Sequence, residues 1–173
     1  MVSQRRRDVR IRPYAASDLD LLQRLLGDAG MMRDLGGPES AEAIWARHQR
    51  YLESTPESGG LFTIETGPAG APVGWVGYWE TMWRDQVVWE SGWHVLPEFQ
   101  GQGLAASGAA RMIELVNARP EHRFLYSFPS VANSASNALC RRLGFSLLGE
   151  AEVEYPKGRV MLSNEWRHEI LCG

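Results

Sequence analysis

The chain has 173 residues, of which 44% are hydrophobic and 23% are charged, and its formal net charge is −3. This length predicts one domain over residues 1–173 with a substantial core, and the composition excludes a disordered chain. No apolar run reaches about 18 residues, so neither a membrane span nor a membrane partner is expected, and the negative charge gives nucleic acid no overall attraction.

The start of the chain is locally basic, with Arg5, Arg6, Arg7, Arg10 and Arg12. We interpret these arginines as a solvated flank of the first strand rather than as an arm that binds nucleic acid. No apolar segment of the kind found in secretory signals follows them, and the two cysteines lie far apart in the sequence. A reduced, cytoplasmic location is therefore the expectation.

The N-terminal part predicts one strand and two helices. Residues 9–13 alternate apolar and charged side chains and end in Pro13, which is typical of a strand. Ser17 is expected to cap a helix, because leucines recur behind it at helical spacing: Leu19, Leu22, Leu25 and Leu26. After an unusually apolar loop over residues 31–38, Ser40 begins the second predicted helix.

Three strands are predicted next, over residues 61–65, 73–80 and 87–96. Turn residues at 66–72 separate the first two, and a short connection at 81–86 leads into the third, so an antiparallel meander is expected. We interpret the tryptophans of this region as core residues rather than as a stacking site: Trp75, Trp79, Trp83, Trp89 and Trp93.

The C-terminal half predicts a strand–helix–strand unit. After the third strand of the meander, a helix extends to about residue 117, where Arg119 and Pro120 end it. A strand over residues 124–128 follows, so the two strands should be parallel with a right-handed crossover. A further helix is capped by Asn133 and closed by Gly144, and late strands are expected over 145–150 and 159–166.

The turn between the central strand and its helix offers a site for a phosphate group. Gly101 and Gly103 let the backbone approach a ligand without a Cβ, and the unpaired N–H groups at the start of the helix point outward together. Those donors and the helix dipole suit an anion. The turn lacks the Gly-Lys-Ser/Thr of a P-loop, and Ala106 stands at the third glycine of a dinucleotide-binding motif. Neither nucleotide motif fits.

The turn instead resembles the central motif of the Gcn5-related N-acetyltransferase (GNAT) family, which is Gln or Arg, two residues, Gly, one residue, then Gly or Ala. Here it reads Gln100-Gly101-Gln102-Gly103-Leu104-Ala105 and follows Val95-Leu96-Pro97. A second family motif is Asn-x-x-Ser, then a helix, then Leu-Gly-Phe. Asn133, Ser136 and Leu143-Gly144-Phe145 match it. The resemblance covers nearly the whole chain and is weakest before residue 60.

The resemblance implies a GNAT-like α/β fold, with a mixed, mostly antiparallel sheet of six or seven strands, one parallel βαβ unit and flanking helices. It also implies acetyl-CoA as the cofactor, with its pyrophosphate on the amides of the glycine turn and its pantetheine arm along the preceding strand. The implied cofactor-binding residues are Val95, Leu96, Gln100, Gly101, Gln102, Gly103, Leu104, Ala105 and Asn133.

Acetyl transfer to an amine by direct attack needs a base, and the resemblance points to the strand carboxylate Glu90, acting directly or through water. Strand alternation places Glu90 and His94 on one face, unless a bulge reverses the parity. Since His94 titrates near neutral pH, the base stays open among Glu90, His94 and a water molecule.

The resemblance also implies two groups that stabilise charge. The developing negative charge on the thioester oxygen would be met by a backbone N–H at Val95 or Leu96. The tyrosine that many members use to protonate the departing thiolate is replaced by Cys140. Ser136, the serine of the Asn-x-x-Ser motif, is therefore the implied proton donor. The catalytic residues expected are Glu90 and Ser136.

By motif, the subgroup looks like the ribosomal-protein N-terminal acetyltransferase branch, and the acceptor is either a small-molecule amine or a protein N-terminus. In the family, the segment after the first strand helps to line the acceptor site, so Met31 and Met32 are candidate pocket walls or else core residues. A homodimer is implied because members are often dimers. No His/Cys cluster has zinc-like spacing, so no metal is expected.

Two alternatives stay open at this point. A non-catalytic acyl-CoA-binding module would keep the turn at residues 100–105 while lacking the usual tyrosine. A protein that uses the fold only for interaction would keep the glycine turn for structural reasons alone.

Overall fold

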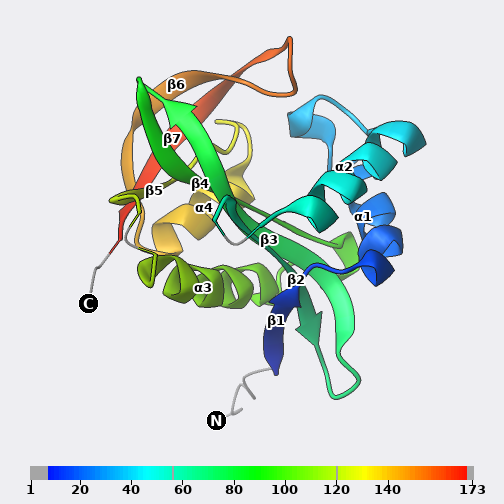
Figure 1. Cartoon of the computed structure of the whole chain (residues 1–173). Helices are drawn as coiled ribbons and strands as arrows, with labels where there is room; N and C mark the ends of the chain where they lie inside the picture. Colours follow the sequence, from blue (N-terminus) through cyan, green and yellow to red (C-terminus); the bar gives the residue numbers. More distant parts are fainter. Residues whose placement is uncertain (1–7, 56, 120, 171–173) are drawn as a thin grey trace.

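The computed structural model describes residues 8–55, 57–119 and 121–170. Within them the strands are β1 (Val9–Pro13), β2 (Gly59–Thr66), β3 (Ala71–Trp83), β4 (Gln86–Val95), β5 (Phe124–Ser127), β6 (Ser146–Glu154) and β7 (Val160–Glu169). These strands form one seven-stranded sheet in the order β1-β2-β3-β4-β5-β7-β6 (Figure 1). Arg5, Arg6, Arg7 and the expected helix terminator Pro120 lie outside the described residues.

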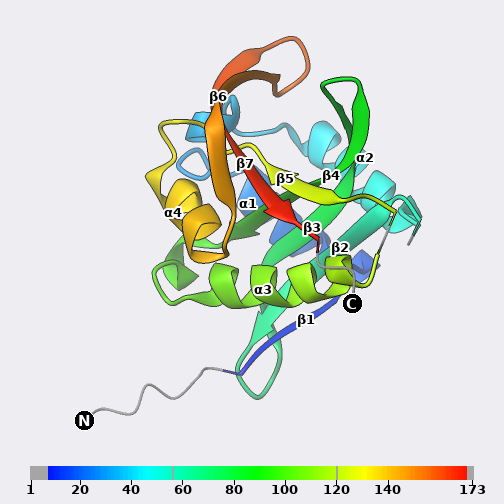
Figure 2. The same ribbon diagram turned by 90° about the vertical axis from the view of Figure 1, so that its left-hand side faces the viewer.

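Four α-helices flank the sheet in the described part of the chain: α1 (Leu19–Leu26), α2 (Ala41–Glu53), α3 (Leu104–Asn117) and α4 (Ser134–Arg142). Helices α1 and α2 cover one face, and α3 and α4 cover the other (Figures 1 and 2). Short 3-10 turns lie at Ala16–Asp18, Arg33–Leu35 and Pro97–Phe99. Over the described residues, every helix is too short or too polar to cross a membrane.

Two of the three hydrophobic clusters in the described part of the chain lie between the helices and the sheet, one for each pair of helices. The larger cluster joins α3 to the sheet and includes Ile64, Val76, Trp89, Met112 and Leu125. The smaller cluster joins α1 and α2 to the sheet and includes Leu22, Leu25, Ile44, Trp75 and Leu96. Each side chain of this kind stabilises the fold by about 1.5–3 kcal/mol when fully buried, so both helical layers are held mainly by apolar burial.

The expected mixed sheet and its parallel β4–α3–β5 unit are confirmed. The cap expected at Ser17 is wrong, because a 3-10 turn comes first and α1 begins after Asp18. Strand β3 continues past residue 80 to Trp83, because its hairpin with β4 is longer than the sequence suggested. In the sheet, β7 lies between β5 and β6, so the last two strands do not follow the order of the chain.

The parallel pair β4–β5 is held at only two positions, Trp89 with Leu125 and Glu90 with Tyr126. Just beyond them, Ser91 donates a side-chain hydrogen bond to the carbonyl of Tyr126 at 3.1 Å. The rest of β4 pairs only with β3, in a continuous register without a bulge. From residue 92 onward, therefore, one edge of β4 faces a gap in the sheet.

The tip of the β3–β4 hairpin is attached to β7, on the far side of β5. The indole N–H of Trp83 donates to Glu165 Oε1 at 3.0 Å, and Arg84 pairs with Glu165 Oε2 at 2.5 Å. The Glu165 side chain is only 2% exposed, and the Trp83 ring also packs on Phe128 at 4.6 Å between centroids. The hairpin tip therefore bridges the strands that flank β5.

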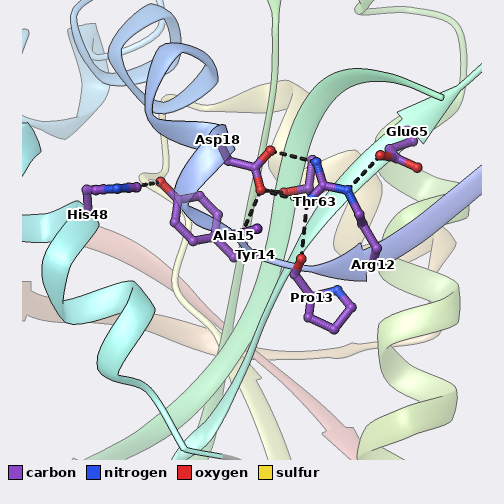
Figure 3. A network of polar contacts seen from close by, with 8 residues as sticks. All are labelled: Arg12, Pro13, Tyr14, Ala15, Asp18, His48, Thr63 and Glu65. Carbon is purple, nitrogen blue, oxygen red and sulfur yellow. Dashed lines mark hydrogen bonds and ion pairs between the residues drawn. The ribbon is translucent and has the colours of Figure 1, made fainter. Parts of the chain in front are cut away.

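A buried carboxylate joins β1, β2 and the start of α1 (Figure 3). Asp18 is 1% exposed and accepts two hydrogen bonds from Arg12, each of 2.7 Å. It also accepts from the Thr63 hydroxyl at 2.8 Å and the Ala15 amide at 2.9 Å. Arg12 bonds Glu65 as well, at 2.7 Å. Burial alone would raise the pKa of Asp18, but these donors outweigh it and lower that pKa below its ordinary value.

Replacing this carboxylate should destabilise the protein in a pH-dependent way. Asp18→Asn leaves the Arg12 guanidinium without its main partner, and we expect a loss of about 2–3 kcal/mol at pH 7, measured by urea denaturation. Because the folded-state pKa is depressed, the stabilisation is present above the ordinary aspartate pKa of about 3.9 and is lost as the pH falls below it. The gap between wild type and variant should therefore shrink in acid.

The matched control is Asp20→Asn, which alters an exposed aspartate in the first turn of the adjoining helix α1. It should change the unfolding free energy by less than about 0.5 kcal/mol. Equal losses in the two variants would contradict the structural role assigned to Asp18.

Candidate functional site

A cavity of about 1130 Å³ occupies the gap in the sheet and the space beside it. One end is lined by the turn after β4 and the start of α3, and its wall continues along α4. The other end is lined by the loop after α1, by α2, by the β3–β4 hairpin and by the end of β6. Segments far apart in sequence thus share one site.

The first turn of α3, directly after the glycine turn, presents backbone donors to this cavity. Gly101 and Gly103 have positive φ angles of 70° and 77°, and a Cβ at either position would meet nothing within 4 Å. Gly103 caps α3, and the first helical hydrogen bond runs from the Ser107 amide to the Gly103 carbonyl, at 3.0 Å. The amides of residues 104–106 therefore have no helical acceptor, which suits an anion such as a phosphate.

The motif side chains around this turn have different positions. Gln100 reaches back to the Val95 carbonyl at 3.0 Å and to Met31 Sδ at 3.2 Å, so it braces the turn against β4. Gln102 donates to the Glu98 carbonyl at 3.1 Å. Gln100, Gly101, Gly103, Leu104 and Ala105 line the cavity, whereas Gln102 is absent from that lining and Leu104 is 2% exposed.

The two candidate amides at the end of β4 face opposite ways. The Leu96 N–H bonds the Val73 carbonyl at 2.9 Å, and the Leu96 side chain is buried in the core. Because backbone groups alternate along a strand, the Val95 groups point to the other edge, as the bond from Gln100 to the Val95 carbonyl indicates. Val95 and not Leu96 therefore presents its backbone to the gap.

Glu90 and His94 lie on the same face of β4, as strand alternation predicted, and both line the cavity. Burial raises the pKa of Glu90, and hydrogen bonds from the side chains of Trp79 and Thr81 partly oppose that rise. Burial and the nearby charge of Arg47 lower the pKa of His94 to about 4. The His94 ring lies 5.1 Å from that of Trp75, and its Nδ1 is buried without a hydrogen-bond partner.

Helix α4 brings Ser136 and Asn133 to the opposite wall. Asn133 caps the helix by accepting from the Ser136 amide at 3.0 Å. The Trp93 indole N–H donates to Ser136 Oγ at 3.4 Å, so the hydroxyl proton of Ser136 can be offered to another acceptor. Asn137 holds the helix in place, since its side-chain amide bonds Ser130, Asn133, Asn164 and Trp166.

Cys140 lies on the other side of the same helix. Its side chain is fully buried in the core cluster under α3, with no exposed surface. Burial raises the pKa of the thiol to about 12, despite a hydrogen bond with Ser127. This buried thiol does not face the cavity, and it can act there neither as a nucleophile nor as an acid.

Several residues of the site were not identified from the sequence. Trp79 and Thr81 face Glu90 because the hairpin register pairs Trp79 with Glu90. Arg47 and Tyr51 from α2, with Tyr155 after β6, line the other end of the cavity. Of the two candidate wall residues, Met31 lines the cavity and Met32 is a core residue with 1% exposure. The one sequence signal that could have identified Trp79 as the partner of Glu90 is the position of the turn between β3 and β4, because the turn sets the register of the two strands.

Comparison with known proteins gives the following findings. A family model described as an acetyltransferase (GNAT) domain matches residues 8–146. No curated protein sequence gives a significant match. The structure resembles RimL, a ribosomal L7/L12 α-N-protein acetyltransferase solved with coenzyme A, with a TM-score of 0.76, 21% identity and coverage of 95% of this chain and 96% of that one.

Two further solved structures share this architecture. One is spermidine N-acetyltransferase from Vibrio cholerae, solved with coenzyme A and spermine, with a TM-score of 0.75, 18% identity and coverage of 94% and 95% of the two chains. The other is aminoglycoside acetyltransferase AAC(6')-Ib with coenzyme A, with a TM-score of 0.75, 17% identity and coverage of 93% and 94%. At these identities the likeness establishes the fold.

The electrostatics of the cavity give a direct test in the free protein. His94 should titrate at a pH of about 4, because burial and Arg47 both disfavour the imidazolium. Arg47→Gln removes the nearby positive charge and should raise the midpoint, measured by NMR of the imidazole C–H signals. Arg33→Gln, at the exposed rim of the cavity, should leave it unchanged. A wild-type midpoint near the ordinary value of about 6.5 would contradict this environment.

Proposed function

The chain belongs to the GNAT acetyltransferase family, and from that premise we propose that it transfers an acetyl group from acetyl-CoA to a primary amine by direct attack of the amine nitrogen. One observation carries the proposal. The glycine turn, through Gln100, Gly101 and Gly103, lines the same continuous cavity as Glu90 and Ser136. A phosphate site, a base and a proton donor are the parts that this reaction requires.

The glycine turn and β4 would hold the cofactor, which supplies the activated acetyl thioester when it is bound. The amides of residues 101–106 would receive the pyrophosphate, and the open space at Gly101 and Gly103 lets the phosphate oxygens approach the backbone. Gln102 and Leu104 would contribute backbone groups, since their side chains are turned elsewhere. The free edge of β4 near Val95 and the Asn133 end of α4 would flank the pantetheine arm.

Glu90 is the base that the environment favours. Its raised pKa makes the carboxylate a better proton acceptor than an ordinary surface glutamate. The lowered pKa of His94 makes that imidazole a weaker base, although it stays neutral at physiological pH. In the proposed reaction the nitrogen–carbon bond forms, the carbon–sulfur bond breaks, and the amine proton passes to Glu90 directly or through water.

Two groups on the opposite side would stabilise the charge that develops. The Val95 N–H, directed to the gap in the sheet, would donate to the thioester oxygen as it becomes negative. Ser136 would give its proton to the departing thiolate, because the Trp93 indole already occupies one lone pair of its oxygen. The serine oxygen would then regain a proton from solvent, and Glu90 would release the amine proton to solvent. The buried Cys140 takes no part in these steps.

The cofactor site is tested by a pair of glycine substitutions. Gly103→Ala and Gly67→Ala change residues with φ of 77° and 76°, and neither added Cβ meets an atom within 4 Å. Both should lose about 1 kcal/mol of stability from left-handed strain. Only Gly103→Ala should weaken acetyl-CoA binding, by at least about tenfold (about 1.4 kcal/mol), as measured by calorimetry. Equal affinities in the two variants would argue against a cofactor on this turn.

The base is tested by Glu90→Gln, with Glu150→Gln on exposed β6 as the control. We expect kcat/KM to fall by about 10²-fold or more for Glu90→Gln, with acetyl-CoA affinity retained. In the wild type, activity should fall as the pH drops through the raised pKa of Glu90, because protonation removes the base, and this limb should vanish in the variant. Acetyl-CoA binding without turnover of any amine would instead favour a non-catalytic acyl-CoA-binding module.

A further inference from the structure

Two glycines leave a bare step on the face of the sheet that carries Glu90. Gly77 of β3 pairs with Gly92 of β4, next on this face to the pair formed by Trp79 and Glu90. A Cβ at Gly92 would lie 2.9 Å from Cη2 of Trp79, so the indole rests directly on the Gly92 backbone. The missing side chain at Gly92 therefore lets the Trp79 ring lie across β4.

A second indole meets the same glycine. Cη2 of Trp75 would be 3.5 Å from a Cβ at Gly92, and the rings of Trp75 and Trp79 lie 6.5 Å apart at 53°. Both rings line the cavity. Their N–H groups differ, because Nε1 of Trp75 is buried and finds no hydrogen-bond partner among the described residues, whereas the Trp79 side chain hydrogen-bonds Glu90. Trp75 is therefore a matched comparison for Trp79 within the same protein.

The Glu90 carboxylate is held from β3 by two donors. The indole N–H of Trp79 and the hydroxyl of Thr81 both donate to it. A carboxylate accepts hydrogen bonds at about four positions, so two donors from one strand restrict its rotation and leave other lone pairs for the cavity that Glu90 lines. Each donor also stabilises the charged form, which makes the carboxylate a weaker base. The arrangement thus favours a fixed orientation over basicity.

We infer that Trp79 is a positioning residue, whose indole, seated over Gly92, holds the Glu90 carboxylate in the orientation that accepts the proton of the amine. The inference rests on the proposed function and adds a residue to its machinery. Orientation matters because a general base works only within hydrogen-bond reach of the proton that it removes. Gly92 is the position that makes this possible, since a side chain there would displace the ring.

Several other groups act on the titration of Glu90. The charged side chains that share its cavity near the acceptor end are Arg33, Asp34, Arg47, Glu152 and Glu154. Its titratable neighbours are His94 on the same strand, Tyr155 after β6, and Tyr126, its partner on β5. None of these groups changes in the variants below, so each is common to the wild type and the variants.

The main test is Trp79→Phe, which keeps an aromatic ring and removes the N–H donor. Because the lost bond stabilised the charged form, the pH midpoint of Glu90 should rise by about one unit. The midpoint is measured from the 13C signal of the carboxyl carbon, assigned by Glu90→Gln. Although the carboxylate is then a stronger base, kcat/KM on the high-pH plateau should fall about tenfold for the best acceptor in a panel of primary amines. Acetyl-CoA affinity, measured by calorimetry, should be unchanged.

The matched control is Trp75→Phe, which removes an unpartnered N–H over the same glycine and should leave the Glu90 midpoint unchanged. Thr81→Val removes the second donor and should raise the midpoint as Trp79→Phe does, whereas Thr81→Ser keeps a hydroxyl and should retain the wild-type value. Equal shifts in Trp75→Phe and Trp79→Phe would contradict the inference. A plateau rate that rises together with the midpoint would also contradict it, because that result indicates a change in basicity alone.

A substitution on the other strand tests the seat of the ring. Gly92→Ala places a Cβ 2.9 Å from Trp79, so it should displace the indole and raise the Glu90 midpoint. A phenylalanine at position 79 lacks the crowded ring atom. Gly92→Ala should therefore have no further effect on the midpoint in the Trp79→Phe background, and additive shifts would overturn this role of Gly92.

The titration requires neither cofactor nor turnover, so failure of the inference and failure of the proposed function can be told apart. Unchanged midpoints in Trp79→Phe and Thr81→Val would overturn the inference even in a protein that acetylates amines. Lack of acetyl-CoA binding would overturn the proposed function, while the midpoints would still decide whether Trp79 holds the carboxylate.

Discussion

The candidate site depends on the separation of β4 from β5 after two paired positions. Backbone N–H and C=O groups in a sheet normally find partners on both neighbouring strands, and an edge left open inside a protein is costly unless something else satisfies it. Here the open edge of β4 beyond Ser91 faces a cavity, with the start of α3 on one side and α4 on the other. The same separation that exposes the Val95 backbone also makes room for a ligand.

Burial has opposite effects on the basicity of the two titratable groups on this face. Removing Glu90 from water disfavours its charged form and raises its pKa, and removing His94 from water disfavours its charged form and lowers its pKa. The sequence offered two candidate bases four residues apart on one strand face. Their surroundings separate them, since only the carboxylate becomes a stronger base than it would be in water.

The parts of the site that depend on local chemistry could be predicted from the sequence. The glycines at 101 and 103, the cap at Asn133 and the parallel β4–α3–β5 unit all follow from short patterns, and the structure contains each of them. The partners of Glu90 could not be predicted, because they depend on a hairpin turn at Arg84 and Asp85. Both residues have positive φ, at 48° and 63°, yet neither is a glycine that would mark the turn. The buried Asp18 was also missed, since its partners Arg12 and Thr63 lie on the strands β1 and β2.

The attachment of the β3–β4 hairpin to Glu165 bears on how a ligand would be admitted. Trp83 and Arg84 tie the hairpin to β7, so the strands on both sides of β5 are braced against each other. Braced in this way, the separation of β4 from β5 is a fixed opening in the sheet. A ligand that enters it exchanges places with solvent and breaks no strand pairing, so little of its binding free energy is diverted into deforming the protein. The buried Glu165 thus contributes to preorganisation of a site that it does not touch.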